Sequence, residues 1–82
     1  MKKLDTNPST VEGNTIYKVG ARVVSFDMEE SNCEIDLRLF DEDTAVYYME
    51  IWNPPLSSIE NWNDETSVFQ AIADYKGFTL KE

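Results

Sequence analysis

The sequence predicts a small α+β domain. Its expected architecture is an antiparallel sheet of three to four strands with one main C-terminal helix packed on one face, in the order β-β-β-α-β. Apolar and polar residues alternate over residues 15–26, 33–39 and 45–52, which is the period of half-buried strands. Apolar residues over 68–75 instead recur three and four positions apart, which is typical of one face of a helix.

The first predicted strand covers residues 15–26, where β-branched and aromatic residues are frequent. Its alternation changes phase after Val23, because Val24 and Phe26 fall on the opposite face. One extra residue in a strand moves the following side chains to the other face of the sheet. We therefore expect a bulge near Ser25.

Residues 1–14 are expected to lie outside this sheet. They are mostly polar and contain Pro8 and Gly13, as terminal segments and loops often do. A chain of 82 residues is of the size of one domain. We therefore predict a flexible N-terminal arm over 1–14 and a single α+β domain over 15–82.

The next two strands form a predicted hairpin. Residues 33–39 are the most regular strand of the sequence, and Asp41-Glu42-Asp43-Thr44 has the composition of a turn. The return strand covers 45–52 and ends before Pro54, because proline cannot donate to a sheet. Its more apolar face, which we expect to meet the helix, carries Ala45, Tyr47, Met49 and Ile51.

The predicted helix begins near Asn63-Asp64-Glu65, where cap residues precede acids, and ends at Gly77. A shorter helical turn is expected from Ser57, and a last short strand around Phe78 and Leu80. The expected buried stripe of the helix is formed by Val68, Ala71, Ile72 and Tyr75, widened by Phe69. We expect this stripe to cover Ile35, Leu37, Tyr47 and Met49.

Negative charge dominates the composition. Sixteen acids against seven bases give a net charge of −9, and Arg38 is the one base between Val23 and Tyr75, a stretch with thirteen acids. Such a field repels nucleic acid and anionic membranes, so we expect neither as a direct partner. It attracts basic protein surfaces and speeds encounter with them. The alternative is that the acids serve solubility alone.

The residues that most enzymes need are scarce. The sequence has no histidine and one cysteine, Cys33, which neighbours Glu34 and is therefore a poor nucleophile. Asp41, Glu42 and Asp43 are better explained as a solvated hairpin tip than as a metal cluster. We predict no enzyme activity, no cofactor and no metal. A single cysteine and the lack of a secretory leader favour the cytoplasm.

Aromatic residues lie among the acids. Tyr48 and Trp52 flank Glu50 on the strand face opposite the expected core, where they would act as interface anchors. In the alternative, Trp52 and Trp62 cap the second side of a small core. The predicted partner-binding residues are Asp27, Glu29, Glu30, Glu34, Asp36, Asp41, Glu42, Asp43, Tyr48, Glu50 and Trp52.

Size, charge and a three-strand meander followed by helices are combined with the pattern Asn61-Trp62-Asn63, Phe69 and Thr79-Leu80-Lys81. In these features the last 50 or so residues resemble small acidic inhibitors made by phages and other mobile elements, type II-A anti-CRISPR proteins above all. The segment with Pro8 departs from the helix with which such a protein would begin. The resemblance implies a stoichiometric inhibitor whose acids imitate nucleic-acid phosphates.

The leading functional hypothesis is a non-enzymatic, acidic protein-binding module. It would be a phage or mobile-element inhibitor that occupies the basic nucleic-acid-binding surface of a host protein, such as a nuclease. One alternative is an immunity or antitoxin protein that neutralises a basic toxin. The others are a structural subunit of a larger assembly and a metal-assisted hydrolase that uses the acidic loops.

Overall fold

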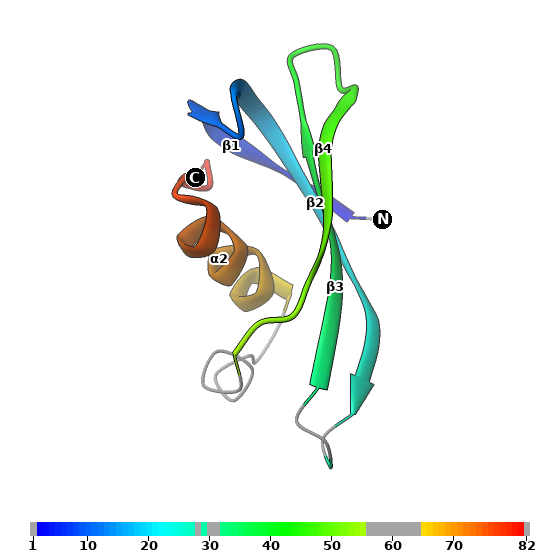
Figure 1. Cartoon of the computed structure of the whole chain (residues 1–82). Coiled ribbons are helices and arrows are strands. Elements are labelled where there is room, and N and C mark those ends of the chain that lie inside the picture. The colour runs from blue at the N-terminus through cyan, green and yellow to red at the C-terminus, as the bar shows by residue number, and fades with distance from the viewer. Residues whose placement is uncertain (1, 28, 30–31, 56–64, 82) are drawn as a thin grey trace.

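The computed structural model describes residues 2–27, 29, 32–55 and 65–81. They form one antiparallel sheet in the order β1-β2-β3-β4, with a helix across one face (Figure 1). The elements are β1 (Lys2–Val11), β2 (Asn14–Asp27), β3 (Asn32–Phe40), β4 (Val46–Trp52) and α2 (Glu65–Lys76). The predicted α+β class is confirmed, but the element order is β-β-β-β-α, not β-β-β-α-β.

The segment expected to be a flexible arm is a strand of the sheet. β1 pairs with β2 from Lys2 opposite Ala21 to Val11 opposite Asn14. Glu12 and Gly13 turn the chain with positive φ angles of 52° and 82°. The register shifts between Asp5 and Ser9. This irregularity accommodates Pro8, which has no N–H for the sheet, and β1 tolerates it because it is an edge strand.

The C-terminal residues lie along the outer edge of β1. The N–H of Asn7 donates to the carbonyl of Thr79, and the N–H of Lys81 donates to the carbonyl of Asp5, both at 3.0 Å. Leu80 forms a single bridge with Thr6, so the short final strand that we predicted is reduced to this contact. The unpaired backbone of one sheet edge is thereby partly covered.

The core lies between β2, β3 and α2. Alternate residues of β3 point toward the helix, and Ile35, Leu37 and Leu39 are fully buried there. The bulge predicted near Ser25 is confirmed, because the β2–β3 register shifts between Val23 and Ser25. The opposite face of the sheet has no covering element among the described residues (Figure 1).

β4 faces the helix with the side opposite to the one that we predicted. Met49 and Ile51, expected in the core, are 59% and 53% exposed. Directly opposed residues in an antiparallel sheet point to the same face, so the pairing places three other β4 residues on the helix side. These pairs are Ile35 with Trp52, Leu37 with Glu50 and Leu39 with Tyr48. Tyr47 also packs against the core, because the register shifts beside Phe40.

The buried stripe of α2 is turned by about one residue from the predicted stripe. Phe69, Ile72 and Ala73 are buried, whereas Tyr75 is 46% exposed. The helix ends as predicted at Gly77, whose φ of 80° suits glycine. The N–H groups of Gly77 and Phe78 donate to the carbonyl of Ala73 at 2.8 and 3.0 Å. The turn predicted from Ser57 and the caps Asn63 and Asp64 lie outside the described residues.

Replacing Ile72 by alanine should lower the free energy of unfolding by about 2–5 kcal/mol, because its fully buried side chain leaves a cavity between helix and sheet. Thr66→Ala, on the exposed side of α2, should change it by less than about 0.5 kcal/mol. Urea titrations followed by tryptophan fluorescence measure both changes. Equal effects would contradict this placement of the helix.

Candidate binding surfaces

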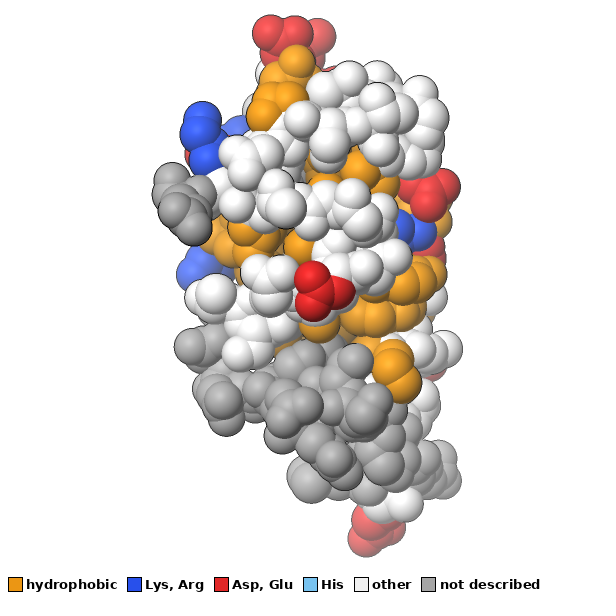
Figure 2. Space-filling model, turned by 90° about the vertical axis from the view of Figure 1, so that its left-hand side faces the viewer, with side chains coloured by type: hydrophobic (Ala, Val, Ile, Leu, Met, Phe, Trp, Pro, Cys, Tyr) orange, Lys and Arg blue, Asp and Glu red, His pale blue; other side chains and the backbone are white. Residues whose placement is uncertain are grey.

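The predicted acidic residues do not gather in one surface. Asp27 and Glu29 lie at the β2–β3 hairpin, and Asp41, Glu42 and Asp43 lie at the β3–β4 hairpin. These hairpins are at opposite ends of a molecule 40 Å long, and acidic side chains are visible at both ends (Figures 1 and 2). Glu30 lies outside the described residues.

The β3–β4 hairpin tip holds its acids in a fixed turn. The Asp41 carboxylate accepts the N–H groups of Asp43 and Ala45 at 2.9 and 3.0 Å. Thr44 adopts a positive φ of 61° at the end of the turn. Glu42 and Asp43 are exposed, and no described lysine or arginine lies within ion-pair distance of any of the three carboxylates. Their negative charge is therefore presented to solvent.

This tip borders a shallow groove beside the β1–β2 turn. The groove is lined by Asn14, Thr15, Tyr17, Asp41, Glu42 and Asp43. Carboxylates supply the opposite charge for a lysine or arginine side chain, and an aromatic ring offers it a cation–π contact. The lining thus has the chemistry to receive a basic side chain of another protein.

Asp36 is not available to a partner. It is 4% exposed and lies on the open face of the sheet, where Arg38 donates to both of its carboxylate oxygens at 3.2 and 3.1 Å. Arg22 completes the cluster at 3.7 Å. Fork-like arginine pairs of this kind satisfy a carboxylate internally, so Asp36 offers a partner little of the surface that its predicted role in binding requires. Glu34, on the same face, is half-buried.

Glu50 belongs to a network that joins β4 to the end of α2. The ammonium group of Lys76 lies 2.8 Å from Glu50 and 2.9 Å from Glu12. Tyr75 donates its hydroxyl to the second Glu50 oxygen at 2.6 Å, and Tyr48 donates to the first. Lys76 also donates to the Tyr48 hydroxyl at 3.0 Å. The Lys76 side chain is only 8% exposed, whereas its partners Glu50 and Glu12 are 22% and 39% exposed, so the lysine is shielded from water and the rim of the network is not.

The pKa values in this network follow from the contacts. Burial raises the pKa of the Glu50 carboxyl, but the hydrogen bonds from Lys76, Tyr48 and Tyr75 outweigh it and hold the pKa below its usual 4.5. Burial likewise lowers the pKa of Lys76, yet its bonds to Glu50, Tyr48 and Glu12 leave that pKa well above the usual value. Both groups are therefore charged near neutral pH.

Trp52 is part of the core, so the expectation that it lies exposed on the face opposite the core is wrong. It is 8% exposed and stacks on Tyr75, with ring centroids 4.5 Å apart and planes 6° from parallel. Tyr48 is half-buried against the same core. The alternative in which Trp52 caps a small core describes the structure. Trp62 lies outside the described residues.

The sequence contained a signal for this network. Lys76 lies four residues after Ile72 and three after Ala73, so it continues the buried stripe of the helix. A lysine on an apolar stripe needs a buried acid as partner. Glu50 is the acid between two aromatic residues of β4, and pairing it with Lys76 would have predicted the correct face.

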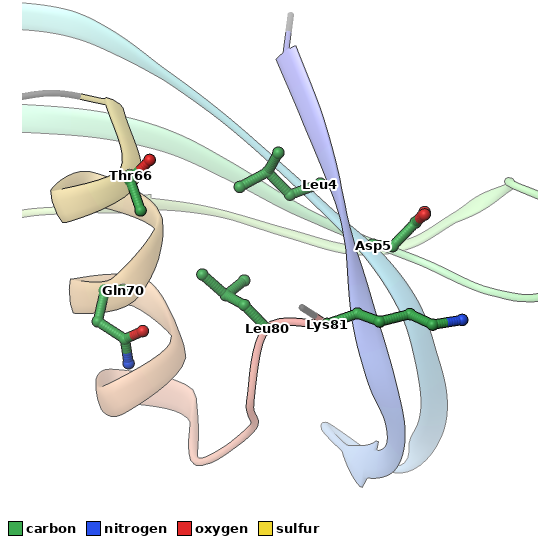
Figure 3. A pocket seen from close by; sticks show the side chains of 6 residues that line it. All are labelled: Leu4, Asp5, Thr66, Gln70, Leu80 and Lys81. Carbon is green, nitrogen blue, oxygen red and sulfur yellow. The ribbon is translucent and has the colours of Figure 1, made fainter.

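A second groove of about 560 Å³ lies between β1, the C-terminal residues and α2. Leu4 and Leu80 point into it together with Thr66 and Gln70 of the helix, whereas Asp5 and Lys81 point to the far side of β1 (Figure 3). Asp5 pairs there with Lys18 at 2.9 Å. The side chains that face the groove are therefore two leucines and two uncharged polar groups. None of these four side chains is an acid or a base.

The open face of the sheet collects bases that are scattered along the sequence. Four of the seven lysines and arginines lie there, because strand pairing places them in adjacent rows; they are Lys3, Lys18, Arg22 and Arg38. In those rows Asp5 pairs with Lys18, and Asp36 pairs with Arg22 and Arg38. The ammonium group of Lys3 lies over the ring of Phe40. Sequence reasoning missed this concentration because it counted charge along the chain and not across the sheet.

No family model matches the sequence, and no characterised protein or solved structure matches the chain. Within the described residues, none of the helices has both the length and the apolarity needed to cross a membrane. In the same residues, no three histidine, cysteine, aspartate or glutamate side chains form a group that could hold a metal ion. Conclusions about function therefore rest on the surfaces described above.

Replacing Lys76 by methionine should destabilise the fold by about 2 kcal/mol, because Glu50 is left half-buried without its cation. Lys81→Met removes the same charge from an exposed position and should change stability by less than about 0.5 kcal/mol. Thermal and urea unfolding of the two variants give the comparison. A Lys76→Met protein as stable as the Lys81→Met protein would show that the network does not hold the helix to the sheet.

Proposed function

We propose that the chain is a non-enzymatic protein-binding module that uses the acidic tip of the β3–β4 hairpin to bind a basic surface of a partner protein. The supporting observation is the tip itself, where Asp41 organises the turn and leaves Glu42 and Asp43 exposed without a basic neighbour among the described residues. A pre-ordered loop loses little conformational entropy on binding, which favours affinity.

The distribution of charge also supports this proposal. The acids in the middle of the sheet are compensated by arginine or lysine, as Asp36 and Glu50 are. Long-range attraction to a basic partner would therefore come mainly from the hairpin ends. Such attraction raises association rates more than it slows dissociation.

A partner that handles nucleic acid remains part of the proposal, as the resemblance to phage inhibitors implies. The charge of the chain gives less support to the idea that it imitates a whole segment of duplex DNA. Duplex DNA carries a charge every 1.7 Å or so, hence about 24 charges over 40 Å, whereas the chain has sixteen acids and a net charge of −9. The hairpin tip is of the size to replace a few phosphates. A basic toxin is the alternative partner, and the same tip would serve it.

The test is capture of partner proteins from a lysate of the organism that carries the gene, at low and high salt, with identification by mass spectrometry. We expect salt-sensitive capture by the wild type, and association at least about ten times slower for Glu42→Lys/Asp43→Lys. Asp41 is left intact in this variant, because it shapes the turn.

Glu29→Lys is the control for Glu42→Lys alone, because each variant reverses one exposed charge at one end of the molecule, and Glu29→Lys should slow association less. Asp27 is left intact, because its carboxylate accepts the N–H of Glu29 and shapes that turn. Surface plasmon resonance with the captured protein measures both rates. Unchanged association of the Glu42→Lys/Asp43→Lys protein would contradict the proposal, and so would equal effects at the two ends.

A further inference from the structure

The β1–β2 turn places a glutamate where the backbone favours other residues. Val11 pairs directly with Asn14, so Glu12 and Gly13 form a two-residue hairpin loop, and both have positive φ angles, 52° and 82°. The first position of such a loop prefers glycine, asparagine or aspartate, because the Cβ of other residues crowds the following carbonyl group. Glu12 therefore holds a disfavoured conformation, and strain of this kind is a reason to look for a function of the side chain.

The Glu12 side chain ties this turn to the end of α2. Its carboxylate lies 2.9 Å from the ammonium group of Lys76. Lys76 has a second acidic partner in Glu50, at 2.8 Å, so the lysine does not depend on Glu12 for its counter-charge. One residue before Glu12, the carbonyl group of Val11 accepts the hydroxyl of Tyr47 at 3.2 Å. The turn is thus fastened at two successive residues, to β4 and to α2.

The residues that follow the turn form one side of the groove beside the acidic tip. We call Asn14, Thr15 and Tyr17 the β2 wall, and they face Asp41, Glu42 and Asp43 across this groove. In the part of the chain that the structure describes, pairing between β2 and β3 starts at Lys18 opposite Phe40, and no backbone pair joins the β2 wall to the tip. The separation of the two sides is therefore set by the contacts that hold the turn.

We propose that Glu12 is a positioning residue, an inference that rests on the proposed function of the acidic tip. By pairing with Lys76, Glu12 fixes the β1–β2 turn and with it the β2 wall, so that the groove has a set width for a basic side chain of the partner. A wall that is already fixed loses little conformational entropy when the partner binds. Without the pair, the β2 wall moves relative to the tip, and binding weakens although the fold is kept.

The experiment compares Glu12→Asn with Glu12→Gln in the full chain. Both variants remove one negative charge, so long-range attraction to a basic partner changes equally. Asparagine suits the turn but is too short to reach Lys76, whereas glutamine keeps the length and an oxygen that accepts a hydrogen bond from Lys76. Glu12→Asn should leave the melting temperature unchanged or raise it, because the backbone strain is relieved. A residue that served the fold alone would show no other effect.

Two NMR measurements separate positioning from stability. Relaxation dispersion of the full chain reports microsecond-to-millisecond motion, and we expect it at the amides of Thr15 and Tyr17 in Glu12→Asn but not in Glu12→Gln or the wild type. Titration with a blocked peptide of alternating glycine and arginine, followed at Tyr17 and Asp43, measures binding to the groove. The peptide should bind Glu12→Asn at least about fivefold more weakly than Glu12→Gln.

The outcomes distinguish this role of Glu12 from the function of the tip. If Glu12→Asn has a β2 wall as rigid as that of the wild type and binds the peptide as well as Glu12→Gln does, the positioning role is overturned and the binding function of the tip stands. If the wild type does not bind the peptide, or if Glu42→Lys/Asp43→Lys binds it equally well, the proposed function is contradicted. Relaxation dispersion then decides by itself whether Glu12 holds the β2 wall.

Discussion

The ion pair between Lys76 and Glu50 determines which side of β4 faces the helix. A strand exposes opposite sides to core and solvent, and β4 has apolar residues on both sides. Trp52 and Tyr48 accompany Glu50 to the core, where large aromatic rings bury more area than Met49 and Ile51 would. Glu50 can lie there only because Lys76, at the end of the helix stripe, supplies its counter-charge.

Two consequences for the surface follow from this arrangement. The aromatic residues that a sequence-based hypothesis assigns to a partner are used inside the protein, as the stacking of Trp52 on Tyr75 shows. Met49 and Ile51 lie on the other side of β4 and are exposed on the open face of the sheet. A single internal ion pair thereby decides which side chains of β4 a second molecule can touch.

Strand pairing also redistributes the charge. Residues far apart in the sequence, such as Asp5 and Lys18, become neighbours across the sheet. Asp36 receives both Arg22 and Arg38 in the same way. The central acids are thus matched by bases, and the hairpin ends keep their exposed acids. A net charge of −9 counted along the chain becomes two separated acidic ends on a molecule 40 Å long.

The local elements were predictable from the sequence, because their signals are local. Alternation located β2, β3 and β4, the phase change located the bulge before Ser25, and Gly77 located the helix end. β1 was missed because Pro8 and a polar composition are also what an edge strand contains. Its pairing depends on β2 and on the C-terminal residues, which no window of sequence brings together.

The inner face of β4 was missed for a similar reason. Both faces of 45–52 carry apolar side chains, and the choice between them is made by Lys76, more than twenty residues away. The prediction of a single acidic surface was wrong because it assumed that acids close in the sequence share a surface. Asp36 and Glu50 are turned toward bases, whereas the acids at the two hairpin ends are exposed, as their composition indicated.

The most direct test of this account is an NMR titration of the Glu50 side-chain carboxyl carbon. We expect a pKa below the usual 4.5, because hydrogen bonds from Lys76, Tyr48 and Tyr75 all favour the ionised form. A pKa lower in the folded chain than in the unfolded one also means that the stabilisation from Glu50 is present above pH 4.5 and is lost as pH falls through the folded value. A pKa at or above 4.5 would contradict the pairing with Lys76, because burial alone raises the pKa of this carboxyl.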